Sequence, residues 1–160
     1  MHETVLYSLL EKMAARLPGF IGRRIFHVEK HVEIEFVPDK DYILSGLNEQ
    51  APSQVPFLRL NFKIRNSNPF TITLDRLLLE VWFGQPTLRG AILERCAILP
   101  GKPGGQDIAF HCAVTDAQKQ QIEHFLSSDS GGQLYIYYTA YFESKMGLTK
   151  ISGTITRSRL

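Results

Sequence analysis

The sequence predicts a mainly β protein: an antiparallel β-sandwich with an N-terminal amphipathic helix and one helix inserted late in the chain. Three observations lead to this prediction. Short runs of alternating apolar and polar residues recur along the chain, which is the period of a half-buried strand. Turn residues separate these runs at intervals of about 8–12 residues, as in sandwiches. Two further stretches repeat their apolar residues with the helical period.

The composition indicates one globular domain. The chain has 160 residues, of which 44% are hydrophobic and 21% charged, and its formal net charge is +2. These values argue against intrinsic disorder, and without a tract of Lys or Arg they give no sign of a nucleic-acid binder. Cys96 and Cys112 lie in the apolar phase of strand-like runs, so we expect buried free thiols, or a disulfide if the two strands are neighbours. Either state of the cysteines is compatible with a cytosolic, reducing compartment. No apolar run in the sequence is long enough to span a membrane.

Residues 1–26 are predicted to form a segment apart from the sandwich domain, residues 27–160. Their apolar residues recur with helical spacing until Pro18-Gly19, where a residue without N–H and a cap-forming glycine end the helix. The candidates for contact with a partner or a membrane are Leu6, Leu9, Leu10, Met13, Leu17, Phe20, Arg23 and Arg24. The stripe favours a helix docked on the domain's own core or on a partner. An anchor at a membrane surface, possible because arginines bind lipid headgroups, is the alternative, and a mitochondrial-type presequence is a third.

Eight strand candidates follow, separated by loops that Pro, Gly and Asn mark. Residues 38–56, with three prolines, are predicted to be a loop. Leu77–Phe83 is almost continuously apolar, which is typical of a strand covered on both faces. The predicted strands are Val28–Val37, Phe57–Arg65, Phe70–Leu74, Leu77–Phe83, Leu88–Leu99, Ile108–Val114, Leu134–Phe142 and Thr149–Arg157.

The inserted helix and the strand after it carry the most distinctive side chains. Thr115 and Gln118 have the spacing of a capping box, which predicts a helix from there to about residue 126. In the next strand Tyr135, Tyr137 and Tyr141 share one face. If that face is open, the row is a candidate partner-binding surface, because tyrosine provides contact area at low entropic cost. The apolar area of three tyrosines favours the other outcome, in which one of the helices covers the row.

The unit Asn66-Ser67-Asn68-Pro69-Phe70 between two strands, followed by Leu77–Phe83, Gly84 and Gly90, resembles the LEA-2 family, the atypical late embryogenesis abundant proteins with a WHy domain. The resemblance covers roughly residues 55–157. It implies a sandwich of immunoglobulin or fibronectin type III style, with roles in desiccation and stress tolerance, protection of other proteins and, in some members, membrane attachment. It implies no catalytic residues. Turn chemistry independently explains Asn66, Asn68 and Pro69. With Gly84 and Gly90 they are the predicted structural turn residues of this unit.

We find no motif for catalysis, a metal or a cofactor. His27 and His31 would lie too far apart on a strand to share one ion. Gly101-Lys102-Pro103-Gly104-Gly105 lacks the Ser or Thr and the following helix of a phosphate-binding loop. Glu33 and Glu35 are best explained as a solvated strand face. We therefore expect a protein that is not an enzyme and needs no cofactor.

The sequence favours a LEA-2-like sandwich that binds or shields proteins or membrane surfaces, in the cytoplasm or peripherally at a membrane. The alternatives are an assembly subunit that docks or oligomerises through its N-terminal helix, and a lipid-binding carrier. Aromatic residues near Lys145, Lys150, Arg157 and Arg159 faintly suggest single-stranded nucleic acid, but the low net charge argues against it.

Overall fold

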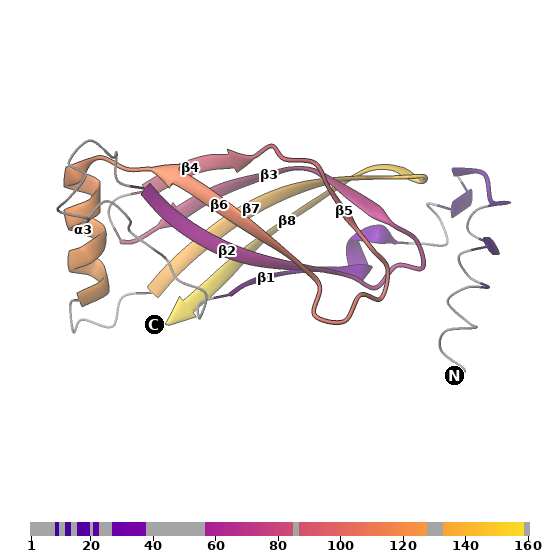
Figure 1. The fold of residues 1–160 in the computed structure, drawn as a ribbon, viewed down its shortest axis with the longest axis horizontal. Coiled ribbons are helices and arrows are strands. Elements are labelled where there is room, and N and C mark those ends of the chain that lie inside the picture. Colours follow the sequence, from indigo (N-terminus) through magenta and orange to yellow (C-terminus); the bar gives the residue numbers. More distant parts are fainter. Residues whose placement is uncertain are drawn as a thin grey trace, which may run out of the picture.

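The computed structural model describes residues 9, 12, 13, 16–19, 21, 22, 27–37, 57–84, 87–127 and 133–158. Within this part the protein is mainly β, with two antiparallel sheets and one α-helix (Figure 1). Most of the predicted N-terminal amphipathic helix and the whole predicted loop 38–56 lie outside the described residues. No described helix is both long and apolar enough to cross a membrane.

The smaller sheet has three strands in the order β1-β2-β6, and the larger has five. The smaller sheet consists of β1 (Val32–Phe36), β2 (Phe57–Asn66) and β6 (Gln106–Ala113). The larger consists of β4 (Thr87–Ile92), β3 (Ile72–Trp82), β7 (Gln133–Ser144) and β8 (Gly147–Ser158), with β5 (Cys96–Ile98) paired to β3 beyond the end of β4. The 3-10 helix η1 (Val28–His31) precedes β1.

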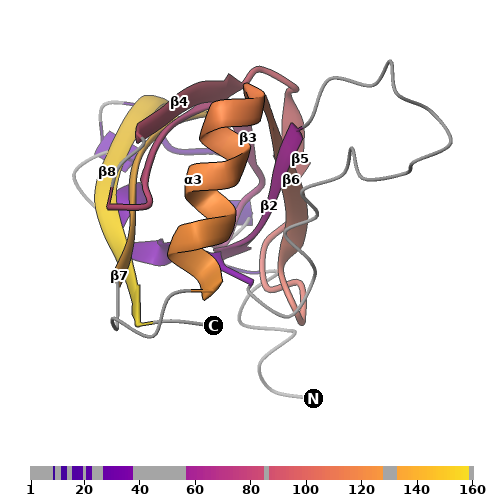
Figure 2. The same ribbon diagram turned by 90° about the vertical axis from the view of Figure 1, so that its left-hand side faces the viewer.

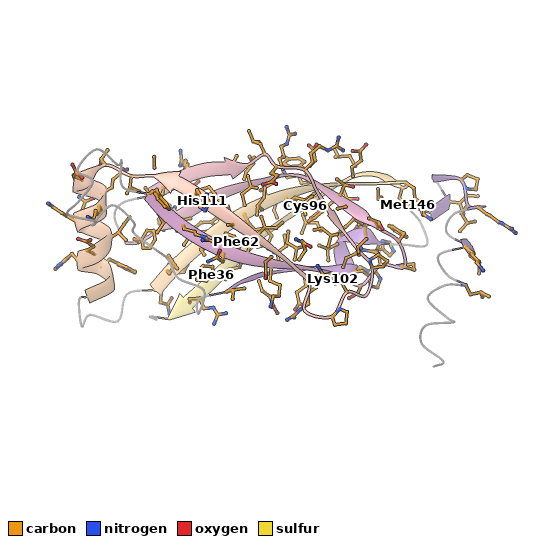
Figure 3. The ribbon with its side chains drawn as sticks, viewed as in Figure 1. Phe36, Phe62, Cys96, Lys102, His111 and Met146 are labelled. Atoms are coloured by element: carbon orange, nitrogen blue, oxygen red, sulfur yellow. The ribbon has the colours of Figure 1, made fainter. Side chains whose placement is uncertain are left out.

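The two sheets face each other around one hydrophobic core, and the helix α3 (Asp116–Ser127) lies across one end of them (Figure 2). Both sheets contribute large side chains: Phe62, Phe110 and Phe142 are at most 1% exposed. Phe36 and Phe62, from adjacent strands of the smaller sheet, pack with their ring centroids 5.8 Å apart (Figure 3). Apolar alternation in the sequence thus correctly identified the inward-facing side of β2 and of β7.

The two sheets approach each other at both pairs of edges. Between β4 and β6, a Cβ atom on Gly90 would lie only 2.7 Å from the ring of Phe110. Between β8 and β1, the Arg157 guanidinium donates to the Phe36 carbonyl at 3.2 Å. Gly90, which the sequence reasoning placed among the turn residues, therefore lies inside β4, where a glycine permits the contact between the sheets.

Two buried asparagines, Asn66 and Asn68, connect the β2–β3 turn to the rest of the fold; we call them the asparagine clasp. The Asn66 amide donates to the Phe70 carbonyl at 2.8 Å and to the Ile98 carbonyl of β5 at 3.0 Å. Its Oδ1 accepts from the backbone N–H and the side-chain amide of Asn68, both at 3.0 Å. The structural role predicted for these residues therefore extends from the turn to β5, because one buried amide meets hydrogen-bonding groups of several segments.

Three strand predictions need correction. The strand predicted from Val28 begins only at Val32, because the Lys30 N–H bonds to the His27 carbonyl in the 3-10 turn, at 2.9 Å. The strands predicted on either side of Asp75 are one strand, β3, in which a register shift at Asp75 changes which parity faces inward. The strand predicted over residues 88–99 is divided into β4 and β5.

The predicted capping box of α3 is confirmed. The Thr115 hydroxyl accepts from the Gln118 N–H at 3.2 Å, and the Gln118 side chain accepts from the Thr115 N–H at 2.9 Å. At the inner face of this helix Ile122 is fully buried, and Phe125 packs edge-on against Phe83 with a centroid distance of 5.8 Å. The helix therefore closes the end of the core and does not lie over the outer face of the larger sheet (Figure 2).

Candidate functional site

The outer face of the larger sheet carries the candidate site. Its β7 side chains alternate between core and surface, so the inward Leu134, Ile136 and Phe142 are buried while the tyrosines of opposite parity face outward. The expectation that one of the helices covers the tyrosine row does not hold for α3, which lies across the end of the sheets (Figure 2), and most of the N-terminal helix lies outside the described residues. We call this surface the aromatic face and define it by Leu78, Trp82, Tyr135, Tyr137, Tyr141 and Leu148.

Several apolar side chains of the aromatic face are exposed to an unusual degree. Tyr137 is 41% exposed, and Leu78 and Trp82 are each 40% exposed. The prediction that Leu77–Phe83 is covered on both faces is therefore wrong, and the sequence reasoning missed both of these β3 residues. A usable signal was present, because Arg76 and Glu80 share the parity of Leu78 and Trp82 and mark that face as polar.

Trp82 is held in place by a small hydrogen-bonded network. Its indole N–H donates to Glu80 Oε1 at 2.9 Å, and its ring meets the Tyr137 ring edge-on with a centroid distance of 5.8 Å. Arg89, on β4, contacts both carboxylate oxygens of Glu80 at 3.1 Å. Because the indole N–H is already satisfied, the rest of the ring is available for an apolar contact.

The same network lowers the pKa of Glu80 below its ordinary value of 4.5. The hydrogen bond from Trp82 is the largest cause, followed by the hydrogen bond and the charge of Arg89. Both donors stabilise the ionised carboxylate. At neutral pH Glu80 is therefore an anion that orients Trp82 rather than a proton donor.

This network predicts a pH dependence for the aromatic face. Because the pKa of Glu80 is lowered, its stabilising contacts persist as pH falls through 4.5 and are lost only at lower pH, when the carboxylate becomes protonated. Trp82 is the only tryptophan of the chain, so its fluorescence should show this transition directly. Glu80→Gln should abolish the transition, with circular dichroism confirming that the chain stays folded. A midpoint at or above 4.5 would contradict the assignment.

The other half of the aromatic face is basic. The Arg76 guanidinium lies over the Tyr141 ring at 4.4 Å from its centroid, as in a cation–π contact. In the sheet register Tyr141 stands between Arg76 on β3 and Lys150 on β8. Nearby, Arg95 forms ion pairs with Asp75 and Glu143.

An open hollow of about 300 Å³ lies between the two halves of the face. Leu78 and Tyr137 contribute apolar surface to it, and Glu80, Arg89 and Thr139 contribute polar groups. Beside it, the hydroxyls of Thr139 and Ser152 are hydrogen-bonded at 3.0 Å. The face thus combines exposed rings, a recess and hydrogen-bonding groups, which is the composition of a binding surface.

The outer face of the smaller sheet differs in kind. Arg65 contacts Glu35 at 2.8 Å and Glu33 at 3.2 Å across the β1–β2 pair. All three side chains are partly or largely exposed, so water screens the pairs. This agrees with the prediction of a solvated strand face for Glu33 and Glu35, and it makes the larger sheet the better candidate for binding.

Only part of the N-terminal candidate set can be placed. Leu9 and Met13 have helical backbone, and their residues are 56% and 55% exposed, while Leu17 is half-buried. The remaining candidates lie outside the described residues: Leu6, Leu10, Phe20, Arg23 and Arg24. Gly22, by contrast, packs closely against Met146 of the β7–β8 turn.

The remaining predicted residues have structural positions. Pro69 is buried beside the asparagine clasp, and Gly84 has the left-handed φ of +73° that a turn glycine permits. Cys96 and Cys112 are half-buried free thiols, and burial raises the pKa of the Cys112 thiol. Among the described residues, no three His, Cys, Asp or Glu side chains gather in a way that could hold a metal ion.

Comparison with known proteins gives similarity to solved structures alone: no protein-family model and no curated protein matches the chain. A crystal structure of a protein from Archaeoglobus fulgidus is 7% identical, with 79% of this chain and 91% of that chain covered and a TM-score of 0.48. The solution structure of a candidate late embryogenesis abundant (LEA) protein is 12% identical, with 99% of this chain and 87% of that chain covered and a TM-score of 0.44. A crystal structure of a candidate ApaA protein from Bordetella pertussis is 12% identical, with 80% and 89% covered and a TM-score of 0.38.

One of these similar structures thus carries the LEA description, the family name to which the sequence resemblance also points.

Proposed function

We propose that this chain is a non-enzymatic β-sandwich domain of LEA-2 type that binds other proteins through its aromatic face and shields them under stress. One observation carries the proposal: Trp82 and Tyr137 are exposed and packed against each other, and Trp82 is held by Glu80, which Arg89 pairs in turn. A side chain that is already ordered loses little conformational freedom on binding, so more of its contact energy appears as affinity.

The chemistry of the face favours a protein as the partner. Trp, Tyr and Arg are the residue types that dominate binding energy at protein interfaces, and all three occur together here. The exposed leucines Leu78 and Leu148, which are 40% and 58% exposed, extend the apolar area on either side. Exposed apolar side chains gathered on one sheet face mark interaction sites more often than isolated residues do.

A binding role also fits the charged groups better than catalysis does. The Glu80 carboxylate has a lowered pKa and is engaged by Trp82 and Arg89. A general acid or base works best with a pKa near the operating pH, so a stabilised carboxylate is poorly suited to proton transfer at neutral pH. Its observed contacts instead fix the tryptophan.

The experiment compares two double variants of the full chain. Trp82→Ala with Tyr137→Ala removes the centre of the aromatic face, whereas Leu93→Ala with Leu99→Ala removes two leucines elsewhere that are 70% and 54% exposed. A drying-sensitive enzyme is dried with each protein, and its activity is measured after rehydration. We expect protection to fall about threefold or more for the first variant and to stay unchanged for the second. Circular dichroism checks that both remain folded.

Equal protection by both double variants would refute a role for the aromatic face, and no protection by the wild-type chain would refute shielding altogether.

A membrane surface or an assembly partner is a second candidate, favoured by the exposure of Leu9 and Met13 one helical turn apart. Flotation with lipid vesicles that depends on these two side chains supports a membrane role. A high mass in solution that depends on them supports assembly. If Leu9→Ser with Met13→Ser changes neither, the second candidate is eliminated.

A further inference from the structure

We propose that the aromatic face recognises an acidic segment of its partner protein, whose carboxylates bind at a basic position formed by Arg76, Tyr141 and Lys150. The inference rests on the proposed function, since it names the chemistry of the partner that the face binds. It depends on the sheet register, the charge balance of the face and the way its rings are packed.

The register brings the three side chains into one row. Tyr141 on β7 is the partner of Arg76 on β3 and of Lys150 on β8. Neighbouring strands are about 4.8 Å apart, so the Cα atoms of Arg76 and Lys150 are separated by roughly 10 Å. Both side chains are long enough to converge above the tyrosine on one carboxylate, and the tyrosine hydroxyl can donate to the same group.

Arg76 is already positioned for this role. Its guanidinium lies 4.4 Å from the centroid of the Tyr141 ring, which orients the group and leaves its N–H donors at the edge. An arginine stacked in this way can still donate two parallel hydrogen bonds to a carboxylate. The Arg76 guanidinium is therefore oriented to bind an anion, unlike a surface arginine that only water surrounds.

The charges of the face are not balanced. Glu80 is paired with Arg89, and Asp75 and Glu143 are paired with Arg95. Among the described residues, no carboxylate contacts Arg76 or Lys150, and both residues are exposed. The three acids of this face are thus paired with two other arginines, and with Arg76 and Lys150 the face carries one net positive charge for a partner of opposite sign.

The packing of the rings favours a protein over a single-stranded nucleic acid. Bases bind by stacking on open aromatic faces. Here Arg76 lies over the Tyr141 ring, and the Trp82 and Tyr137 rings meet edge-on with an interplanar angle of 65°. The exposed aliphatic side chains of Leu78 and Leu148 suit apolar residues of a peptide. A peptide segment that alternates apolar and acidic residues therefore fits the face: its apolar side chains can contact the leucines and rings, and its carboxylates can contact Arg76 and Lys150.

The test uses the full chain and short synthetic peptides that share one set of leucines and phenylalanines. In one peptide the intervening residues are glutamate, in the second glutamine and in the third lysine, and binding is followed by Trp82 fluorescence. We expect the glutamate peptide to bind about fivefold to tenfold tighter than the glutamine peptide, with the lysine peptide weakest. This preference should diminish as salt is added.

Matched variants assign the effect to the basic position. Arg76→Gln with Lys150→Gln should remove the preference for glutamate, because it weakens binding of the glutamate peptide more than binding of the glutamine peptide. Lys30→Gln with Lys102→Gln removes the same charge from exposed positions in η1 and in the β5–β6 loop (Figure 3), and it should leave the preference intact.

The outcomes separate this inference from the proposed function. If the glutamate and glutamine peptides bind equally well, the inference fails and the proposed function stands. If the Arg76 and Lys150 double variant keeps the preference, the basic position is wrong. If oligothymidine binds more tightly than any peptide, the face recognises nucleic acid and the inference is overturned. If no peptide binds, the proposed protein-binding role fails as well.

Discussion

Asn66→Ala is expected to lower the free energy of unfolding by about 4 kcal/mol, because buried backbone groups that lose their partners cost about 1–3 kcal/mol each. Three backbone groups would be affected: the carbonyls of Phe70 and Ile98 and the N–H of Asn68. Asn66 is only 4% exposed, so water cannot easily replace these bonds. Thermal unfolding should report a fall in Tm of about 10 °C.

Two control variants separate the asparagine clasp from ordinary turn chemistry. Ser67→Ala changes an exposed side chain in the same turn and should alter stability by less than about 0.5 kcal/mol. Asn66→Asp keeps an accepting oxygen and suits a turn as well as asparagine does, but it cannot donate to two carbonyls. It should therefore destabilise at least as much as alanine. If Asn66→Asp left the free energy of unfolding unchanged, the asparagine clasp would contribute no more to stability than an ordinary turn does.

Gly90→Ala is expected to destabilise the fold by about 2 kcal/mol, the usual range for an added methyl group in a closely packed core. The new Cβ would lie 2.7 Å from two ring carbons of Phe110, which is 1% exposed and has little room to move. The direction of the change in stability is informative, because replacing a glycine by alanine without strain generally stabilises a protein. Urea unfolding gives the measurement.

A second substitution tests whether the Phe110 ring is the cause. Phe110→Leu leaves room beside β4, so adding Gly90→Ala to it should cost much less than adding Gly90→Ala to the wild-type chain. Ala91→Val, on the exposed side of the same strand, should have an effect within about 0.5 kcal/mol. Additive effects of the two core substitutions would contradict the proposed contact.

The aromatic face illustrates how far the sequence predicts a site. Alternation within β7 correctly placed Tyr135, Tyr137 and Tyr141 together, because residues two apart on a strand point to the same side. The residues that β3 contributes, Trp82 and Arg76, were missed, since an unseen shift of parity at Asp75 and a continuous apolar run concealed the outer side of β3. The pairing of Arg76 and Lys150 with Tyr141 depends on register between strands distant in sequence, which period-two patterns do not encode.

The sequence by itself determined which residues of β2 and β7 face the core, where most strands lie, that the chain turns at Asn66–Pro69 and that a capped helix follows Thr115. These features depend on local periodicity and on local hydrogen bonding by side chains, so they can be read from neighbours in the chain. The tertiary structure alone decided that α3 closes the end of the sheets instead of covering the tyrosines (Figure 2). It also decided that Gly90 lies against Phe110 rather than in a turn. Both depend on how distant elements pack together, and the exposure of a surface follows from that packing.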